Sequence, residues 1–199
     1  IKCKKINFTT KKTRHSIIPP APFYLTTLQT EAYKFHSITP SQTLQTAQRL
    51  YLAGLISYPR TSSQKIPESM QPRQVLKKLE KNHSKLTQHA TRQKPVEGGK
   101  SDPAHPAIIP TGNHQNLEGQ DEKIYNLIMK RFISCFCDNA ELENKKIEAE
   151  INKMKFSAKG MEVLKQGWMS VYPAKMKEKE IKDMNGEAVI EKVNILEKE

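Results

Sequence analysis

The chain has 199 residues, enough to bury the core of one domain or of two modest ones. Its 33 lysines and arginines against 21 acidic residues give a formal net charge of +12, which indicates a polyanionic partner, although a lysine-rich solvated surface would explain the charge as well. The sequence contains no apolar run near the ~20 residues of a membrane span, and its three cysteines lack a disulfide framework, so we expect a cytoplasmic protein.

The first segment, residues 1–18, alternates weakly between apolar and polar side chains and predicts one strand or a hairpin. Pro19, Pro20 and Pro22 end it and form a stiff connection, where we place a domain boundary. Because the chain starts at Ile1, without a methionine and with strand-like sequence, we expect it to be part of a longer protein.

Two short helices are predicted between residues 26 and 54. Each opens with a capping-box pattern, with Thr26 and Thr39 as the expected N-caps, and Gly54 is the natural stop of the second helix. With the extended segment that follows, this pair suggests a helix-turn-helix with a wing. An ordinary αα-hairpin that packs a core fits the pattern equally well.

The stretch Tyr58-Pro-Arg60 follows the second helix and cannot be helical. Pro59 disfavours the α region for the residue before it, so Tyr58 is expected to be extended. Along an extended segment, residues two apart point to the same face, which would bring the phenol of Tyr58 beside the guanidinium of Arg60. A nucleophilic oxygen beside a fixed cation suits attack on a phosphodiester, whereas the plainer interpretation is a half-buried tyrosine and a surface ion pair.

The middle of the chain alternates helix and loop. Pro67 and Pro72 bracket the start of a helix, and residues 90–119 show little periodicity and predict a long loop of the kind that often carries function. A strong helical pattern returns over 120–137. It ends in Cys135-Phe-Cys137, whose thiols do not share a helical face and are expected to be buried and free rather than bound to zinc.

After Leu142 the pattern shortens to strand-like pieces, and Trp168 is either a core anchor or a base-stacking residue. The charged stretch 175–185 is expected to be an exposed loop. Helices in the middle and strands at both ends predict an α+β fold. The expected strands are 146–151, 155–158, 162–163, 168–172 and 188–196.

Four stretches, in order, resemble segments of type IA DNA topoisomerases in the style of archaeal topoisomerase I. Residues 48–62, which contain Tyr-Pro-Arg-Thr, resemble the active-site segment. Residues 19–29 resemble the entry into the catalytic-tyrosine domain, 101–111 the histidine motif, and 166–172 the Gly-Trp strand of the arch domain. The match runs from the start to about residue 174, and four ordered motifs are far more specific than one Tyr-Pro-Arg.

The resemblance implies an architecture for this chain. It implies a winged-helix-like catalytic-tyrosine domain at 21–118, inserted into a β-rich arch domain. The N-terminal strands of that arch would be residues 1–20, and a helix with the returning strands would be residues 119–199.

The resemblance also implies a reaction. In the family, the tyrosine matching Tyr58 cleaves one DNA strand through a covalent 5′-phosphotyrosine, allows strand passage and religates without ATP. The matching arginine, Arg60, stabilises the phenolate and the phosphoryl transition state, and His105 assists near the scissile phosphate. Further DNA contacts are expected from the same motifs: Gln48, Arg49, Thr61, Ser62 and Thr111. Ser62 and Pro106 stand where many bacterial members carry aspartate and glutamate.

The family's Mg²⁺ lies in an acidic Toprim domain with an Asp-x-Asp pattern, and no such pattern occurs in these 199 residues. We therefore expect no metal ligands in this chain and no relaxation of supercoils by the chain alone. The expected partners are DNA, preferably single-stranded, and the Toprim domain, with no membrane. Two rival interpretations are a non-catalytic winged-helix DNA-binding module and a basic RNA-binding or ribosomal protein.

Overall fold

The structure is a computed structural model that describes residues 5–151, 154–173 and 186–189. Helices and an antiparallel sheet are both present, which confirms the predicted α+β class. None of the helices in these ranges is long and apolar enough to cross a membrane.

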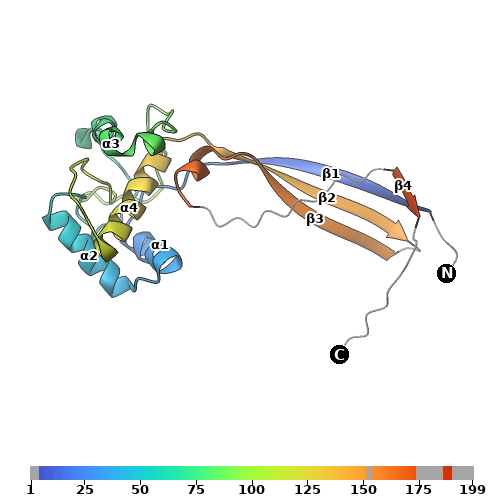
Figure 1. Ribbon diagram of the computed structural model, residues 1–199, viewed down its shortest axis with the longest axis horizontal. Helices are drawn as coiled ribbons and strands as arrows, with labels where there is room; N and C mark the ends of the chain where they lie inside the picture. Colours follow the sequence, from blue (N-terminus) through green and yellow to red (C-terminus); the bar gives the residue numbers. More distant parts are fainter. Residues whose placement is uncertain (1–4, 152–153, 174–185, 190–199) are drawn as a thin grey trace. The chain divides into compact units, whose positions relative to one another are not determined.

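The chain divides into two compact units, and the boundaries are set by contacts rather than by sequence order (Figure 1). A helical unit comprises residues 18–140 together with the segment from residue 166. A strand unit takes its described residues from both sides of it: 5–17, 141–165 and 186–189.

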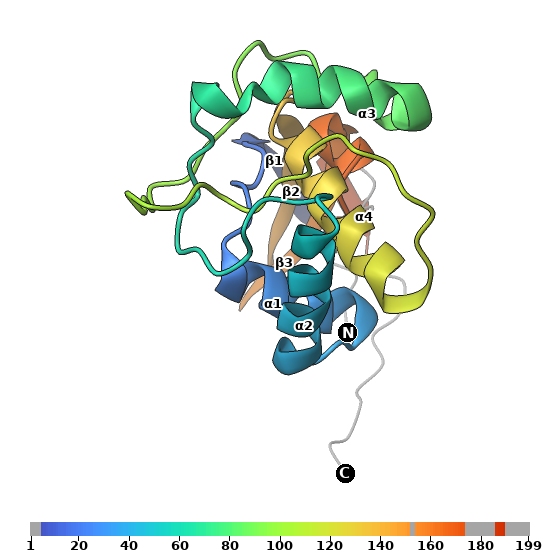
Figure 2. The same ribbon diagram turned by 90° about the vertical axis from the view of Figure 1, so that its left-hand side faces the viewer.

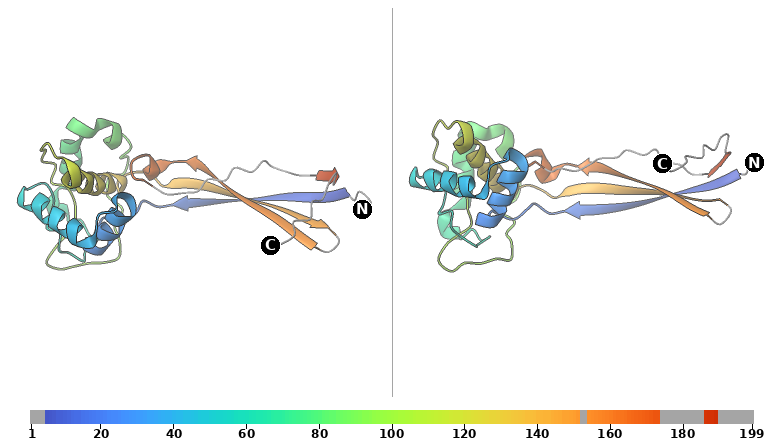
Figure 3. Two further views of the ribbon diagram at one scale, coloured as in Figure 1. Left: turned by 60° about the horizontal axis from the view of Figure 1, so that its bottom comes forward. Right: turned by 90° about the horizontal axis from the view of Figure 1, so that it is seen from below.

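The strand unit is one sheet of four strands: β1 (Lys5–Ile17), β2 (Ala140–Ile151), β3 (Met154–Lys165) and β4 (Gly186–Val189). The strand order is β3-β2-β1-β4, with β2 antiparallel to β3 and β1 antiparallel to β4. Figure 3 shows the long strands twisting across one another, as strands of L-residues do.

The strands predicted from the C-terminal half were of the right kind but too short. The pieces at 146–151, 155–158 and 162–163 belong to the two continuous strands β2 and β3, which pair from Glu141↔Lys165 to Ile151↔Met154. Charged residues between the apolar ones do not end these strands, because the ladder is made by the backbone. The predicted loop 175–185 and most of the strand 188–196 lie outside the described residues.

The strand predicted at 168–172 is wrong. Gly167–Ser170 forms a 3-10 turn, in which Gly167 has a φ of 50° and the backbone N–H of Trp168 donates to Asp138 O at 3.0 Å. A side chain on Gly167 would meet the backbone of residue 139, so the close approach requires glycine. Trp168 is buried, which makes it a core residue rather than a base-stacking one.

The helical unit is built around its last helix. It contains four helices: α1 (Leu25–His36), α2 (Pro40–Leu52), α3 (Pro72–Thr87) and α4 (Gly119–Ser134). Helix α4 contacts each of the other three (Figure 2). Its buried Ile124, Ile128 and Phe132 recur every four residues and form the centre of the core. The expected grouping of this helix with the returning strands differs from its contacts, which lie with the helices.

Threonine side chains stabilise the N-terminal ends of both α1 and α2. Thr39 caps α2 as predicted: its hydroxyl accepts from Gln42 N at 3.3 Å, and Gln42 Oε1 accepts from Thr39 N at 3.1 Å. Helix α1 has Tyr24 as its N-cap instead of Thr26. The side chain of Thr27 there accepts from Tyr24 N at 3.2 Å, so a nearby threonine makes the bond expected from another residue.

Cys135 and Cys137 are buried free thiols, as predicted. Burial raises the pKa of each thiol to about 12. Both side chains follow the C-terminal end of α4, and their Sγ atoms bond to carbonyl groups of that helix. They are therefore packing residues of the helical core.

Candidate active site

The loop that carries Tyr58 begins where α2 ends. Gly54 leaves the helix with a φ of 70°, a conformation that suits glycine, and its carbonyl accepts from Thr111 Oγ1 at 2.7 Å. Residues 55–62 form neither helix nor continuous strand, as Pro59 predicts. We call them the tyrosine loop, and residues 101–111 the histidine loop.

Ser57 joins the tyrosine loop to the histidine loop. Its backbone N–H donates to Ile109 O at 2.9 Å, and its hydroxyl donates to Ala107 O at 2.8 Å and accepts from Ile109 N at 2.9 Å. Ser57 is only 9% exposed, so these bonds are shielded from water and fix the register of the two loops. Ser57 is not among the site residues expected from the sequence, where its only signal is a small hydroxyl beside the candidate nucleophile.

Tyr58 lies between two other rings. Tyr51, from the last turn of α2, meets it edge-on, with centroids 5.3 Å apart and planes at 73°. His105, from the histidine loop, lies on it with centroids 4.9 Å apart and planes at 33°. Two of the three predicted catalytic side chains are thus brought together. Tyr58 remains partly exposed, so a ligand can reach it.

A carboxylate stands behind His105. Asp102 Oδ2 lies 3.9 Å from His105 Nδ1, and Asp102 Oδ1 accepts from the backbone N–H of Ala104 at 2.9 Å. The bond from Ala104 is the main reason why the pKa of Asp102 is lowered, and the charge and backbone of His105 add to it. Asp102 is not among the site residues expected from the sequence, although it lies three residues before the histidine in the same motif.

Arg60, the third predicted catalytic residue, has an exposed side chain. Among the described residues its guanidinium makes no hydrogen bond or ion pair, and no cation–π contact joins it to Tyr58. The expected placement of both side chains on one face therefore stays a prediction. What the structure offers is an unneutralised cation two residues from the tyrosine.

Comparison with known proteins places the chain in a family. The family described as DNA topoisomerase matches residues 2–199. The chain belongs to the type IA DNA topoisomerases. It is 47% identical over 174 residues to DNA topoisomerase 1 of Methanothermobacter thermautotrophicus, a match that covers 84% of this chain and 24% of the relative. It is 40% identical over 198 residues to DNA topoisomerase 1 of Methanocaldococcus jannaschii, covering 95% of this chain and 26% of the relative.

The fold is also similar to that of a topoisomerase of known structure. Full-length topoisomerase I from Thermotoga maritima matches with a TM-score of 0.69 at 22% identity, over 93% of this chain and 33% of that one. This likeness concerns the fold. The chain spans about a quarter of the length of the two archaeal topoisomerases that it matches.

Two residues expected to touch DNA through the topoisomerase motif lie on α2. Arg49 pairs with Asp121 of α4, and its Nη2 donates to Thr46 Oγ1 at 3.0 Å. The hydrogen bond to Asp121 raises the pKa of Arg49. Gln48 is half-buried, and its Oε1 is a buried acceptor that no donor reaches. Arg49 is thus engaged within the protein, whereas Gln48 keeps an unused acceptor.

The other three expected DNA-contacting residues differ in exposure. Thr61 is buried, and its hydroxyl donates to His105 O at 3.5 Å and accepts from Ser63 N at 3.0 Å. The hydroxyl of Thr111 is bound to the Gly54 carbonyl described above. Only Ser62 has an exposed side chain. The hydroxyls of Thr61 and Thr111 are therefore engaged in bonds within the protein, and their contact with DNA stays a prediction.

The described part of the chain contains no group of three or more histidine, cysteine, aspartate or glutamate side chains placed to hold a metal ion. The carboxylate nearest to Tyr58 in the contacts above, Asp102, faces His105 and a backbone N–H. These residues do not fit the Mg²⁺ centre that the topoisomerase resemblance implies.

Proposed function

We propose that this chain carries the nucleophile of a type IA DNA topoisomerase, and that the phenolic oxygen of Tyr58 attacks a phosphodiester in one DNA strand. The observation that supports this best is the 4.9 Å approach of the His105 ring to the Tyr58 ring. Two bonded loops hold these rings at a partly exposed position, whereas a tyrosine that only packed the core would need neither the histidine nor access to solvent.

The proposed step breaks one bond and makes another. Tyr58 loses its proton and its oxygen bonds to phosphorus, while the bond from phosphorus to the 3′ oxygen breaks and that oxygen takes up a proton. A phenol in water has a pKa near 10, so the developing charge must be stabilised. Arg60 supplies a fixed cation that can bind two phosphate oxygens, and His105 is placed to donate to one of them.

The same chemistry explains why no nucleotide is needed. The phosphotyrosine bond replaces one phosphodiester by another, so the free 3′ hydroxyl can reverse the step after strand passage. The sequence accordingly has no Gly-x-x-x-x-Gly-Lys-Ser/Thr loop for a nucleotide.

We propose single-stranded DNA as the preferred substrate. Tyr51 and Tyr58 are partly exposed aromatic rings at one site, and unpaired bases stack on such rings. Ser62 is exposed and offers its hydroxyl to the strand, whereas the unused acceptor of Gln48 is buried and does not support a contact from that residue.

We assign the finer architecture by the family resemblance. Helices α1 and α2, which pack as neighbours, would form the winged-helix-like part of the tyrosine domain at 21–118. The sheet would belong to the arch. Mg²⁺, which neutralises phosphate charge when bound, would be held by a Toprim domain, since the described residues here offer no site for it.

The experiment is covalent trapping on a single-stranded oligonucleotide labelled at its 3′ end, with the Toprim-containing part and Mg²⁺ supplied. Denaturing gels should show the label on the chain, and Tyr58→Phe should abolish it. Tyr33→Phe, which changes an exposed tyrosine on α1, is the control and should leave trapping intact.

Each rival predicts a different result. A non-catalytic winged-helix module predicts sequence-specific binding of duplex DNA without any trapped product. A basic RNA-binding protein predicts a preference for RNA. If Tyr58→Phe still becomes labelled, the nucleophile has been assigned to the wrong residue.

A further inference from the structure

The outer face of α3 carries a row of cations that the proposed cleavage site does not use. Arg73, Lys77, Lys81 and Lys85 recur every four residues, and all four are exposed. Each step of four residues advances about 6 Å along a helix, and residues at this spacing share a side of it. The helix is interrupted at His83, so the first three lie on its regular part.

The opposite side of α3 fixes the direction in which this row faces. Helix α3 lies at the outside of the helical unit and packs on α4 (Figure 2). The side chains that the helix buries are Val75, Leu76 and Leu79, together with Thr87 at its end. We call the exposed series from residue 73 to residue 85 the α3 row.

The α3 row has no carboxylate partners. Glu80 is the only acidic residue of the helix, and among the described residues no ion pair involves Lys77, Lys81 or Lys85. Arg73 donates to the carbonyl of Arg92 at 3.0 Å, a bond that leaves its charge unneutralised. Like charges at this spacing repel one another and oppose the helix, and a bound polyanion would remove the repulsion.

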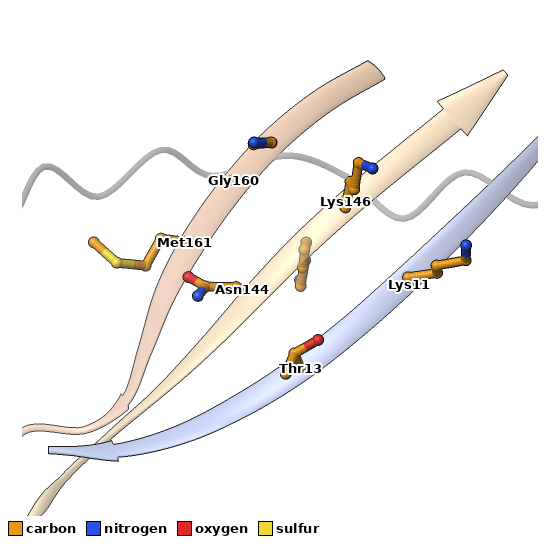
Figure 4. A pocket seen from close by; sticks show the side chains of 8 residues that line it. Lys11, Thr13, Asn144, Lys146, Gly160 and Met161 are labelled. Atoms are coloured by element: carbon orange, nitrogen blue, oxygen red, sulfur yellow. The ribbon is translucent and has the colours of Figure 1, made fainter. Parts of the chain in front are cut away.

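The lysines of the sheet behave differently. A hollow of about 550 Å³ on the strand unit is lined by side chains from β1, β2 and β3, including Lys11 and Lys146 (Figure 4). Both of these lysines reach Glu148, at 2.9 and 2.5 Å. The bond from Lys146, followed by that from Lys11, holds the pKa of Glu148 at about 2. Lys11 and Lys146 are thus neutralised by a shared carboxylate, whereas, among the described residues, the lysines of the α3 row are not.

We propose that the α3 row binds the sugar-phosphate backbone of duplex DNA, without regard to base sequence. A lysine ammonium acts as a point charge and is suited to phosphate contacts. Pro72–Thr87 contains no phenylalanine, tyrosine or tryptophan, so the row offers no platform for unpaired bases. Tyr51 and Tyr58 provide such rings at the cleavage site instead. The inference rests on the proposed function only in that the partner is DNA, since backbone binding needs no chemistry at the tyrosine.

The test removes the charges and follows the salt dependence of binding. In the variant Lys77→Gln/Lys81→Gln/Lys85→Gln, helix propensity is nearly unchanged because glutamine and lysine are similar helix formers. Each lost phosphate contact should lower the slope of log K against log salt for duplex DNA by about 0.9, so the variant should lose up to about 2.7. Trapping on single-stranded DNA should stay at the wild-type level.

A matched control removes three other exposed lysines: Lys34→Gln/Lys94→Gln/Lys159→Gln. It has the same net charge and should keep the wild-type slope. If the slope falls equally in both variants, the α3 row affects binding only through the net charge of the protein. If the slope is unchanged in the α3 variant, the row is a solvated surface. Either result overturns the proposal.

Two further measurements separate the possible causes of failure. The variant Lys77→Arg/Lys81→Arg/Lys85→Arg keeps the charges and should keep the slope, so a slope that falls in this variant as well would contradict a purely electrostatic contact. Tyr58→Phe should lose trapping but retain the duplex slope. If the wild-type protein gives no trapped product but the glutamine variant still lowers the slope for duplex DNA, the proposed function is wrong and the proposal for the α3 row is supported.

Discussion

The rings of Tyr58 and His105 lie 4.9 Å apart, although they belong to loops that are far apart in the sequence. The contact is maintained by bonds between the loops, chiefly those of Ser57 to residues 107 and 109. A histidine in this position can act on a phosphate that Tyr58 attacks, because both side chains are then within reach of the same group. Changes at His105, at Asp102 beside it and at Ser57 should therefore each alter cleavage.

His105→Ala should slow cleavage strongly. Removing a group that donates to the transition state is expected to lower the single-turnover cleavage rate by about 10²-fold. The exposed His114 provides the control, and His114→Ala should cleave like the wild type. Equal rates for the two variants would exclude His105 from the reaction.

Asp102→Asn should have a smaller effect than loss of the histidine, about tenfold. The pKa of Asp102 is lowered, mainly by the N–H of Ala104, so the carboxylate is charged at neutral pH and lies 3.9 Å from His105 Nδ1. This contribution is present above the carboxyl's ordinary pKa of 3.8 and is lost as the pH falls through the lowered value. From pH 5 to 9 the carboxylate stays charged, so the asparagine variant should be slower than the wild type throughout that range, and wild-type rates for it would contradict a positioning role.

Ser57→Ala should weaken both the fold and the site. It leaves the Ala107 carbonyl and the Ile109 N–H without their partner in a buried place, which costs about 1–3 kcal/mol of unfolding free energy. Urea unfolding measures this loss, and trapping should fall with it because the loops no longer share a register. Ser62→Ala changes an exposed serine of the same loop and should be neutral in stability.

Arg131→Met tests a buried network in the helical unit. Arg131 Nη1 lies 3.2 Å from Glu31 Oε1, its Nε donates to Ala21 O at 2.7 Å, and Tyr172 also bonds to Glu31. Burial raises the pKa of Tyr172, so it donates as a neutral phenol. Removing the arginine leaves Glu31 without its cation and should cost about 3 kcal/mol by urea unfolding.

Two milder changes calibrate that result. Tyr172→Phe removes only one bond to a charged group and should cost about 1.5 kcal/mol. Arg73→Met removes an exposed arginine and should change the unfolding free energy by less than about 0.5 kcal/mol. A cost for Arg131→Met no greater than that for Arg73→Met would show that the network contributes nothing.

The buried thiols predict a loss of stability in alkali. The folded state keeps the protons of Cys135 and Cys137 until about pH 12, while a thiol in the unfolded chain releases its proton near 9. Their contribution is therefore complete below about pH 9 and declines as the pH rises towards 12, by at most about 1.4 kcal/mol per unit for each thiol. Unfolding measured from pH 8 to 10.5 tests this.

Thiol labelling gives an independent check in a Cys3→Ser background. At pH 8 the two remaining thiols should react with a thiol reagent only after urea unfolds the chain, since they are buried and neutral. Rapid labelling of the folded protein would contradict their burial.

The sequence by itself determined the features that depend on neighbours in the chain. Pro59 kept the tyrosine loop out of a helix, Thr39 and Gln42 set the start of α2, and Gly54 marked its end, because each of these effects acts within a few residues. The ordered motifs around Tyr58 and His105 also determined the family, which the comparisons confirmed.

Only the tertiary structure decided what depends on partners from elsewhere in the chain. The bonds of Ser57 to the histidine loop, the pairing of Arg49 with Asp121 and the burial of Thr61 have no local signature. The same holds for α4: its apolar pattern fits packing on the helices or on the strands, and only its contacts show that it packs on the other helices. Which side chains face a ligand and which hold a loop is set by packing across the chain, and no periodicity in the sequence records that packing.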